Sequence, residues 1–146
     1  MRISLGSDHG GYPLKEAVKA HLLEQGHEVH DVGTHSLESV DYPEYGRLAA
    51  ECVADGTCER GIVVCSTGIG ISIAANKVRG VRAGLCTDVF TARLTREHND
   101  TNVLALGAFV LGEALAFAIV DTWLETPFSG GERHARRIDA IRRMET

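Results

Sequence analysis

The sequence has no long hydrophobic run, few aromatic residues and no excess of positive charge. None of its apolar stretches approaches the roughly 20 residues that a membrane-spanning helix needs. Residues 1–6 lack the apolar stretch of a signal peptide. The 20 Asp and Glu residues outnumber the 15 Lys and Arg residues, for a formal charge of −5, and this balance argues against nucleic acid as a main partner. We therefore expect neither a membrane protein nor a nucleic-acid-binding protein.

Cysteine spacing also excludes some classes of protein. The four cysteines, Cys52, Cys58, Cys65 and Cys86, include no CxxC pair, the spacing typical of metal and redox motifs. The chain has 146 residues, 44% of them hydrophobic and 24% charged, which suits a globular protein that buries its own core. Such a protein does not need disulfides, so we expect a cytoplasmic protein with free thiols. No repeat or linker interrupts the chain, and residues 1–146 are expected to form one domain.

Five short apolar stretches have strand character, and segments with helical periodicity separate them. The strands are expected at residues 3–7, 28–32, 61–65, 81–86 and 103–107. In the first helix, Leu14, Val18 and Leu22 recur at four-residue spacing between Pro13 and Gly26, residues typical of a helix start and stop. Further helices are expected around residues 45–53, 71–77, 114–123 and, as a basic C-terminal helix, about 129–146. The alternation predicts an α/β protein: a three-layer αβα, Rossmann-like fold with a five-stranded parallel sheet.

Polar residues follow three of these strands, at the edge where parallel sheets bind their ligands. They are residues 7–11, 65–70 and 87–88. The second of these segments contains Gly68 and Gly70 and leads into a helix, so its backbone N–H groups can approach an anion or oxyanion. It matches neither the Walker A pattern nor GxGxxG, which argues against a nucleotide. Cys65 lies beside the helix start, a position that favours a thiolate acting as base or nucleophile, although an isolated cysteine is more often a buried structural thiol.

Three further motifs have both a functional and a structural interpretation. Asp8 and His9 could contact a polar substrate, or Asp8 could cap a helix. His98, within residues 96–100, could move protons near neutral pH, or it could lie on a solvated helix end. Arg133 and Arg137 share one helical face and could hold a phosphate, or they could belong to a solvated amphipathic helix. The other histidines lack metal-ligand spacing, so no metal site is expected.

Together these motifs resemble the ribose-5-phosphate isomerase B and galactose-6-phosphate isomerase family. The resemblance covers nearly the whole chain and rests on GSDHGG at residue 6, DYP at 41, CSTGIG followed by SIAANK at 65, REHND at 96, and GG at 130 followed by RH and Arg137. It implies a cofactor-independent enzyme, without metal, that interconverts an aldose and a ketose phosphate of the ribose-5-phosphate/ribulose-5-phosphate type through an enediolate. It also implies a homodimer or tetramer whose active sites draw residues from both subunits.

The resemblance assigns roles to individual residues. Cys65 is expected to be the base, Thr67 to assist proton transfer and His98 to open the sugar ring. The loop amides of residues 66–70 are expected to stabilise the oxyanion. Asp8, His9 and Asn99 are expected to bind the sugar hydroxyls, and Arg133 and Arg137 are expected to bind the phosphate. The substrate-binding residues are thus expected to be Asp8, His9, Ser66, Gly68, Ile69, Gly70, Asn99, Arg133 and Arg137.

Three residues depart from the family pattern. Ser66 stands where glycine is usual, and Glu132 is an extra acidic residue between Gly131 and Arg133. Phe109 stands where ribose-phosphate members usually carry an arginine that helps to bind phosphate. Because a charge-assisted hydrogen bond is worth about 1.5–3 kcal/mol, the loss of a guanidinium leaves open another four- to six-carbon sugar or an unphosphorylated one. A non-catalytic sugar-phosphate-binding domain and a flavodoxin-like electron carrier are the remaining alternatives, and the 5% aromatic content argues against the latter.

Overall fold

A computed structural model describes residues 1–145, in which strands and helices alternate as far as the fifth helix. The strands are β1 Arg2–Ser7, β2 Glu28–Gly33, β3 Arg60–Cys65, β4 Ala83–Leu85 and β5 Val103–Gly107. The helices are α1 Tyr12–Glu24, α2 Tyr42–Ala54, α3 Ile69–Asn76, α4 Val89–Asn99, α5 Glu113–Glu125 and α6 Glu132–Arg142. Within the described chain, no helix is long and apolar enough to span a bilayer.

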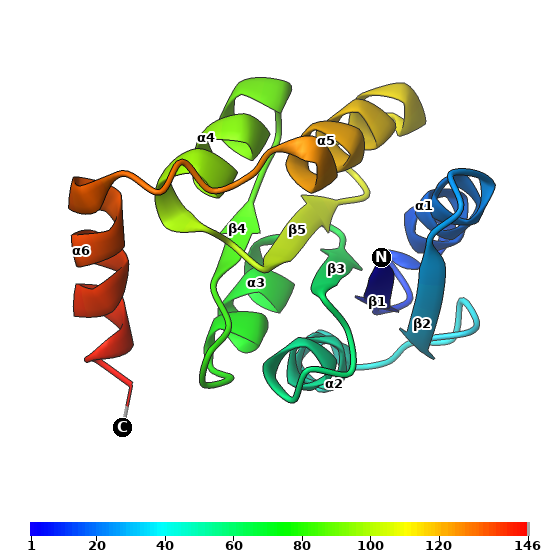
Figure 1. Cartoon of the computed structure of the whole chain (residues 1–146). Helices are drawn as coiled ribbons and strands as arrows, with labels where there is room; N and C mark the ends of the chain where they lie inside the picture. Colours follow the sequence, from blue (N-terminus) through cyan, green and yellow to red (C-terminus); the bar gives the residue numbers. More distant parts are fainter. Residues whose placement is uncertain (146) are drawn as a thin grey trace.

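The strands form one parallel sheet in the order β2-β1-β3-β5-β4. Helices α1, α4 and α5 cover one face and α2 and α3 cover the other (Figure 1). The expected three-layer Rossmann-like αβα fold with a five-stranded parallel sheet is thereby confirmed. β3 lies in the middle of the sheet, between β1 and β5, which brings the residues that follow it to the centre of the carboxyl edge.

The alternation of side chains along β3 divides the core into two halves. Ile62 and Val64 pack on the α1, α4 and α5 side, whereas Val63 and Cys65 pack on the α2 and α3 side. The residues from Ile62 to Val64 are completely buried, and each such aliphatic side chain stabilises the fold by about 1.5–3 kcal/mol. The β-branched run that ends in Cys65 therefore anchors that residue rigidly at the edge of the sheet.

Some element boundaries differ from the sequence-based expectation. β4 was expected over residues 81–86 but covers three residues, because the N–H of Val81 closes a turn on the carbonyl of Val78 at 3.1 Å. The N–H of Arg82 is bonded to the side-chain oxygen of Asn102 at 2.8 Å. Helix α3 begins two residues earlier than expected, at Ile69. Helix α6 begins three residues later, at Glu132.

Helix α4 begins at a side-chain cap, Asp88, which follows the fourth strand and was therefore expected at the ligand-binding edge. The carboxylate of Asp88 accepts a hydrogen bond from the N–H of Thr91 at 2.6 Å, and Asp88 is the N-cap residue of the helix. This bond lowers the pKa of Asp88, because it stabilises the ionised carboxylate. Asp88 therefore has a structural role in this chain.

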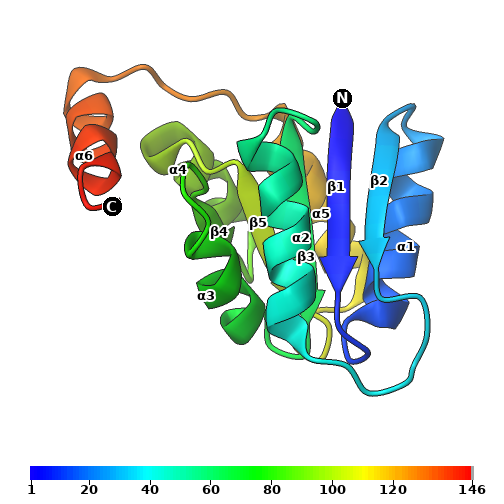
Figure 2. The same cartoon turned by 90° about the horizontal axis from the view of Figure 1, so that it is seen from below.

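Helix α6 lies apart from the layers. Figure 2 shows an extended segment leading from α5 to α6, and it shows α6 toward the amino ends of the strands. The side chains that α6 buries are those of His134 and Ile138. The rest of the helix is largely exposed, so its basic side chains remain accessible.

Candidate active site

Cys65 ends β3, and its sulfur accepts a hydrogen bond from the backbone N–H of Gly68 at 3.2 Å. The contact requires a tight turn, in which Gly68 has a φ of 79°, a conformation that favours glycine. A side chain at this position would also lie 2.8 Å from the backbone carbon of Leu106. The loop thus brings an N–H dipole to the sulfur, which stabilises negative charge there. Cys65 itself is 5% exposed, so the thiol lies just beneath the surface.

The other three cysteines have surroundings that disfavour the thiolate. Burial raises the pKa of Cys58 to about 11 and that of Cys86 to about 11. Burial, followed by the negative charges of Asp55 and Glu51, raises the pKa of Cys52. These thiols are protonated at neutral pH, and all four cysteines are free. They provide internal references for the reactivity of Cys65.

The amides of the Cys65 loop are not equally free to bind a substrate oxygen. The N–H of Gly68 is directed to the sulfur, and the N–H of Ile69 donates to the hydroxyl of Thr67 at 3.2 Å. The amides of Gly70 and Ile71 belong to the first turn of α3, where the helix offers them no acceptor. The amides at the start of α3 are therefore free to bind a substrate oxygen, whereas those of Gly68 and Ile69 already have acceptors.

The loop after β1 lies beside this loop, because Ser7 of β1 pairs with Val64 of β3. The carboxylate of Asp8 accepts the N–H of Gly11 at 2.9 Å, which holds the turn before α1, although the N-cap position itself belongs to Gly11. His9 accepts the N–H of Val40 at its Nδ1, at 3.1 Å, so a neutral His9 carries its proton on Nε2.

Two contacts pack neighbouring segments against the loops. A side chain at Gly10 would meet the hydroxyl of Ser66, so the small residue makes room for the serine that departs from the family pattern. A side chain at Gly70 would lie 2.6 Å from the ring of Tyr42, which belongs to the DYP motif. We call the predicted residues on these two loops the loop group: Asp8, His9, Cys65, Ser66, Thr67, Gly68, Ile69 and Gly70.

The remaining predicted residues come together elsewhere. His98, in the last turn of α4, stacks on His134 of α6 with ring centroids 4.2 Å apart and ring planes 10° apart. Burial lowers the pKa of His134, and His98, Arg133 and Arg137 lower it further, which favours the neutral imidazole. Arg133 and Arg137 are exposed on α6. We call the second set the helix group: His98, Asn99, Arg133, His134 and Arg137.

The two groups lie at opposite edges of the sheet. Cys65 is opposite Gly107 at the carboxyl end of β5, whereas the carbonyl of Asn99 accepts a bond from Arg82, just before β4. Arg82 directly precedes Ala83, which is opposite Val103, so it lies about five residues, or about 16 Å, from the level of Gly107 along the strands. Since β5 separates β3 from β4, the two points are also about 10 Å apart across the sheet. One copy of the chain therefore does not bring His98 to Cys65.

His134 has a place in the helix group that the sequence analysis had not assigned. His134 belongs to the motif that follows Gly131. The residue on which it stacks, His98, is 36 positions earlier in the chain and lies on another helix. Periodicity relates residues within one element, so it gave no signal for this pair. Among residues 1–145, no three His, Cys, Asp or Glu side chains gather closely enough to hold a metal ion.

Comparisons with known proteins agree with this geometry. The pattern that defines the Ribose/Galactose Isomerase family matches residues 3–141. The ribose-5-phosphate isomerase B of Escherichia coli is 51% identical over 144 residues, covering 99% of this chain and 96% of the relative. The structure of Clostridium thermocellum ribose-5-phosphate isomerase B matches with a TM-score of 0.98 and 57% identity, over 99% of this chain and 97% of that one.

A further solved structure includes a sugar phosphate. Ribose-5-phosphate isomerase B from Mycoplasma genitalium, with bound ribulose-5-phosphate, matches with a TM-score of 0.94 and 40% identity. The match covers 99% of this chain and 95% of that chain.

Proposed function

Since this chain belongs to the ribose/galactose isomerase family and is an aldose–ketose isomerase of sugar phosphates, we propose that it interconverts ribose 5-phosphate and ribulose 5-phosphate with Cys65 as the base. The observation that carries the proposal is the position of Cys65 at the centre of the carboxyl edge, with an N–H donor on its sulfur. Family membership argues against a flavodoxin-like carrier and against a non-catalytic binding domain.

The proposed reaction begins from the open-chain aldose. The thiolate of Cys65 removes the proton from C2, the C–H electron pair forms a C1=C2 double bond, and the carbonyl electrons move to O1. Amides at the start of α3 stabilise the negative charge of this enediolate. The Cys65 thiol then returns the proton to C1, while the proton on O2 passes to O1 and C2 becomes the carbonyl carbon. Thr67, whose hydroxyl lies in the same loop, assists the transfer between the oxygens.

The remaining roles are distributed over both groups of residues. Asp8, His9 and Asn99 hold substrate hydroxyls, and His98 opens the ring by proton transfer. Arg133 and Arg137, which share one face of α6, bind the phosphate. Within the loop group, Ser66, Gly68, Ile69 and Gly70 line the reacting end of the sugar. No metal or organic cofactor is required by these steps.

A second copy of the chain supplies the helix group to each active site. Exposed apolar side chains surround the loop group, and such a patch is typical of a protein interface. They are Ile69 at 53%, Leu85 at 37%, Phe109 at 78% and Val110 at 55% exposure. Leu85 lies against Gly68, and the N–H of Phe109 donates to the carbonyl of Ser66 at 2.9 Å. We therefore propose a homodimer, with a tetramer as a further assembly, in which two shared sites form.

Two other aspects of the proposal follow from single observations. Phe109 beside Ser66 favours, as a second candidate, a sugar of another length or one without phosphate, because an apolar ring offers no charge to a phosphate.

The four free thiols suit the reducing cytoplasm. We also expect residues 1–146 to act as one domain.

The direct test is exchange of the C2 proton of ribose 5-phosphate with deuterium in D2O, followed by NMR. The wild-type protein is expected to catalyse exchange and to form ribulose 5-phosphate. Cys65→Ser should lose both activities, because a serine hydroxyl is a far weaker acid than a thiol. Cys52→Ser, which removes a protonated thiol outside both groups, is the matched control and should retain them. Unimpaired exchange by Cys65→Ser would remove Cys65 as the base.

A further inference from the structure

Arg96, the first residue of the REHND motif, is buried although it carries a charge. It is 3% exposed, and its guanidinium reaches three acceptors in different parts of the chain. Its Nε donates to the carbonyl of Thr126 at 3.1 Å. Its Nη1 donates to the carbonyl of Thr101 at 2.6 Å and to the carboxylate of Asp100 at 2.8 Å. One side chain thus links the end of α4, the start of β5 and the end of α5.

The turn held by Arg96 directly follows His98 and Asn99. Asp100 ends α4 with a φ of 46°, a left-handed conformation that residues other than glycine rarely adopt. A second guanidinium supports it, because Arg82 donates to the carbonyls of Asn99 at 2.9 Å and Asp100 at 2.8 Å. Two arginines therefore fix the backbone that carries the imidazole of His98.

Arg96 also fixes the route of the chain toward α6. Its bond to Thr126 holds the segment after α5 beside the end of α4. Further along this segment, the N–H of Ser129 donates to the carbonyl of Glu97 at 3.3 Å. Helix α6 begins three residues later, and His134 in its first turn stacks on His98. Arg96 and Glu97, which are neighbours in the REHND motif, thus determine where α6 starts.

We propose that Arg96 is a positioning residue, which holds α4 and α6 in the arrangement that stacks His98 on His134 beside Arg133 and Arg137. Arg96 does not touch the substrate. It acts through the backbone turn after His98 and through the start of α6. The catalytic meaning of this arrangement rests on the proposed function, but the arrangement itself can be measured without substrate.

The test replaces Arg96 by lysine and follows the histidines by proton NMR. A lysine has one ammonium group and lacks the planar fork that reaches several acceptors at fixed angles. In Arg96→Lys we expect the His98 and His134 ring signals to lose the shifts caused by stacking. We also expect the pKa of His134 to rise toward its ordinary value, because burial and the neighbouring His98, Arg133 and Arg137 would lower it less.

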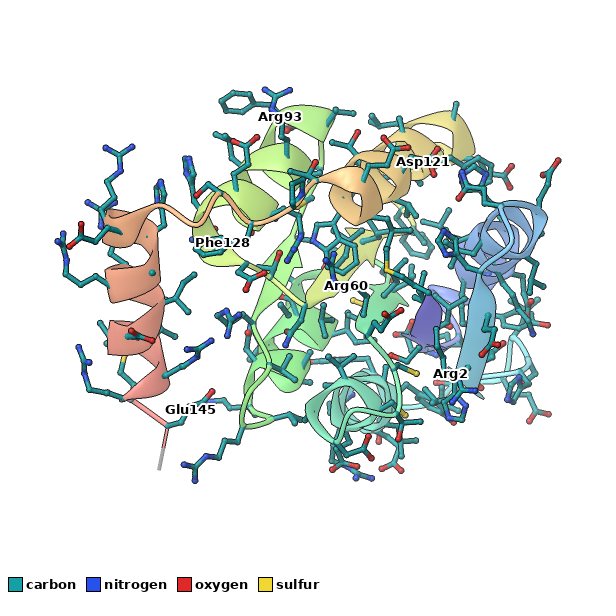
Figure 3. All side chains as sticks on the ribbon, in the orientation of Figure 1. Arg2, Arg60, Arg93, Asp121, Phe128 and Glu145 are labelled. Atoms are coloured by element: carbon teal, nitrogen blue, oxygen red, sulfur yellow. The ribbon has the colours of Figure 1, made fainter. Side chains whose placement is uncertain are left out.

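Arg93→Lys is the matched control, since Arg93 is an exposed arginine one turn earlier on α4 and extends away from the sheet (Figure 3). It should leave both ring signals unchanged. Val18→Ala, on the buried face of α1, controls for a general loss of stability and should also leave both ring signals unchanged. If Arg96→Lys does not fold, Asp100→Asn replaces the charged acceptor of the Arg96 Nη1 by a neutral one. This change weakens one of the same contacts and should shift the signals in the same direction.

Histidine signals in a folded Arg96→Lys or Asp100→Asn that match those of Arg93→Lys would overturn the proposal. In an isomerase assay, Arg96→Lys should lower kcat/KM about 10- to 100-fold, the cost of a misplaced catalytic group. A wild-type protein without isomerase activity would contradict the proposed function and the catalytic meaning of Arg96. The NMR signals would still decide whether Arg96 holds the stack.

Discussion

Phe109 is 78% exposed and belongs to the apolar patch around the loop group. Its backbone N–H is bonded to Ser66, so the side chain projects beside the loop that contains Cys65. An arginine at this position, as the resemblance led us to expect, would bring a guanidinium to the site. The identity of residue 109 is therefore expected to control how strongly the enzyme binds a phosphate group.

Phe109→Arg should lower the KM for ribose 5-phosphate by about 10- to 100-fold, since one charge-assisted hydrogen bond is worth about 1.5–3 kcal/mol. The KM for unphosphorylated ribose should not change. Steady-state kinetics with both sugars measures the difference, and Phe109→Leu, which removes the ring without adding charge, is the control. An equal gain for both sugars would show that residue 109 does not contact the phosphate.

At the residue scale, the sequence could nominate individual side chains for the proposed site, but it could not predict their neighbours. Cys65, His98 and Arg133 could be selected because their chemistry is apparent from residue type and motif. The stack of His134 on His98 and the contacts of Arg96 could not be predicted, because their partners lie on other elements. Asp88 was assigned to the ligand-binding edge, but it caps α4, since Asp suits both roles.

Helix α1 and strand β2 are joined by a buried ion pair. The Nζ of Lys15 lies 2.6 and 2.7 Å from the two carboxylate oxygens of Asp31, and the Lys15 side chain is completely buried. Burial alone would raise the pKa of Asp31, but hydrogen bonds from Lys15, the N–H of Gly33 and Lys19 outweigh it and lower the pKa below its ordinary value. The ionised pair therefore stabilises the native state at neutral pH.

Asp31→Asn should reduce the free energy of unfolding by about 3 kcal/mol, because removal of one partner leaves the other charge buried and unpaired. Since the pKa of Asp31 is lower in the folded than in the unfolded state, this stabilisation is full above the unfolded value and disappears as the pH falls through the folded one. Urea unfolding of both proteins from neutral to acidic pH measures the difference. The difference in the free energy of unfolding between the two proteins should become smaller at acidic pH.

Lys19→Met is the matched control for Asp31→Asn, because Lys19 also contacts Asp31 but its side chain is one-third exposed. Lys19→Met should lower the free energy of unfolding much less than Asp31→Asn does. A difference between the wild-type protein and Asp31→Asn that stays constant across the acidic range would contradict the assignment of the effect to the carboxylate charge.

Element order and sheet type could be predicted from the sequence because hydrophobic periodicity reports directly on burial. The run that ends in Cys65 belongs to a central strand, as its β-branched residues indicated. Boundaries depended on contacts between elements, which periodicity does not contain. β4 is short because the N–H of Arg82 donates to the side-chain oxygen of Asn102. Helix α6 starts later than expected because the N–H of Ser129 donates to the carbonyl of Glu97.

At the scale of the whole molecule, the predicted active site is divided. The loop group lies at the carboxyl edge of the sheet, and the helix group lies beside α4 and α6, toward the opposite edge. The sequence nominated all of these residues except His134 as candidates, but it could not show that one chain keeps them apart, since that depends on where α4 ends in space. If a second copy completes each site, the exposed apolar patch around Phe109 is the surface that it covers.

Complementation between two inactive variants tests this account most directly. Cys65→Ala and His98→Asn should each be nearly inactive alone. When the two are unfolded, mixed in equal amounts and refolded together, half of the dimers are mixed, and one of the two sites in each mixed dimer is intact. Activity should therefore recover to about a quarter of the wild-type value. A mixture as inactive as the separate variants, with mixed dimers demonstrated by mass spectrometry, would contradict a site shared between copies.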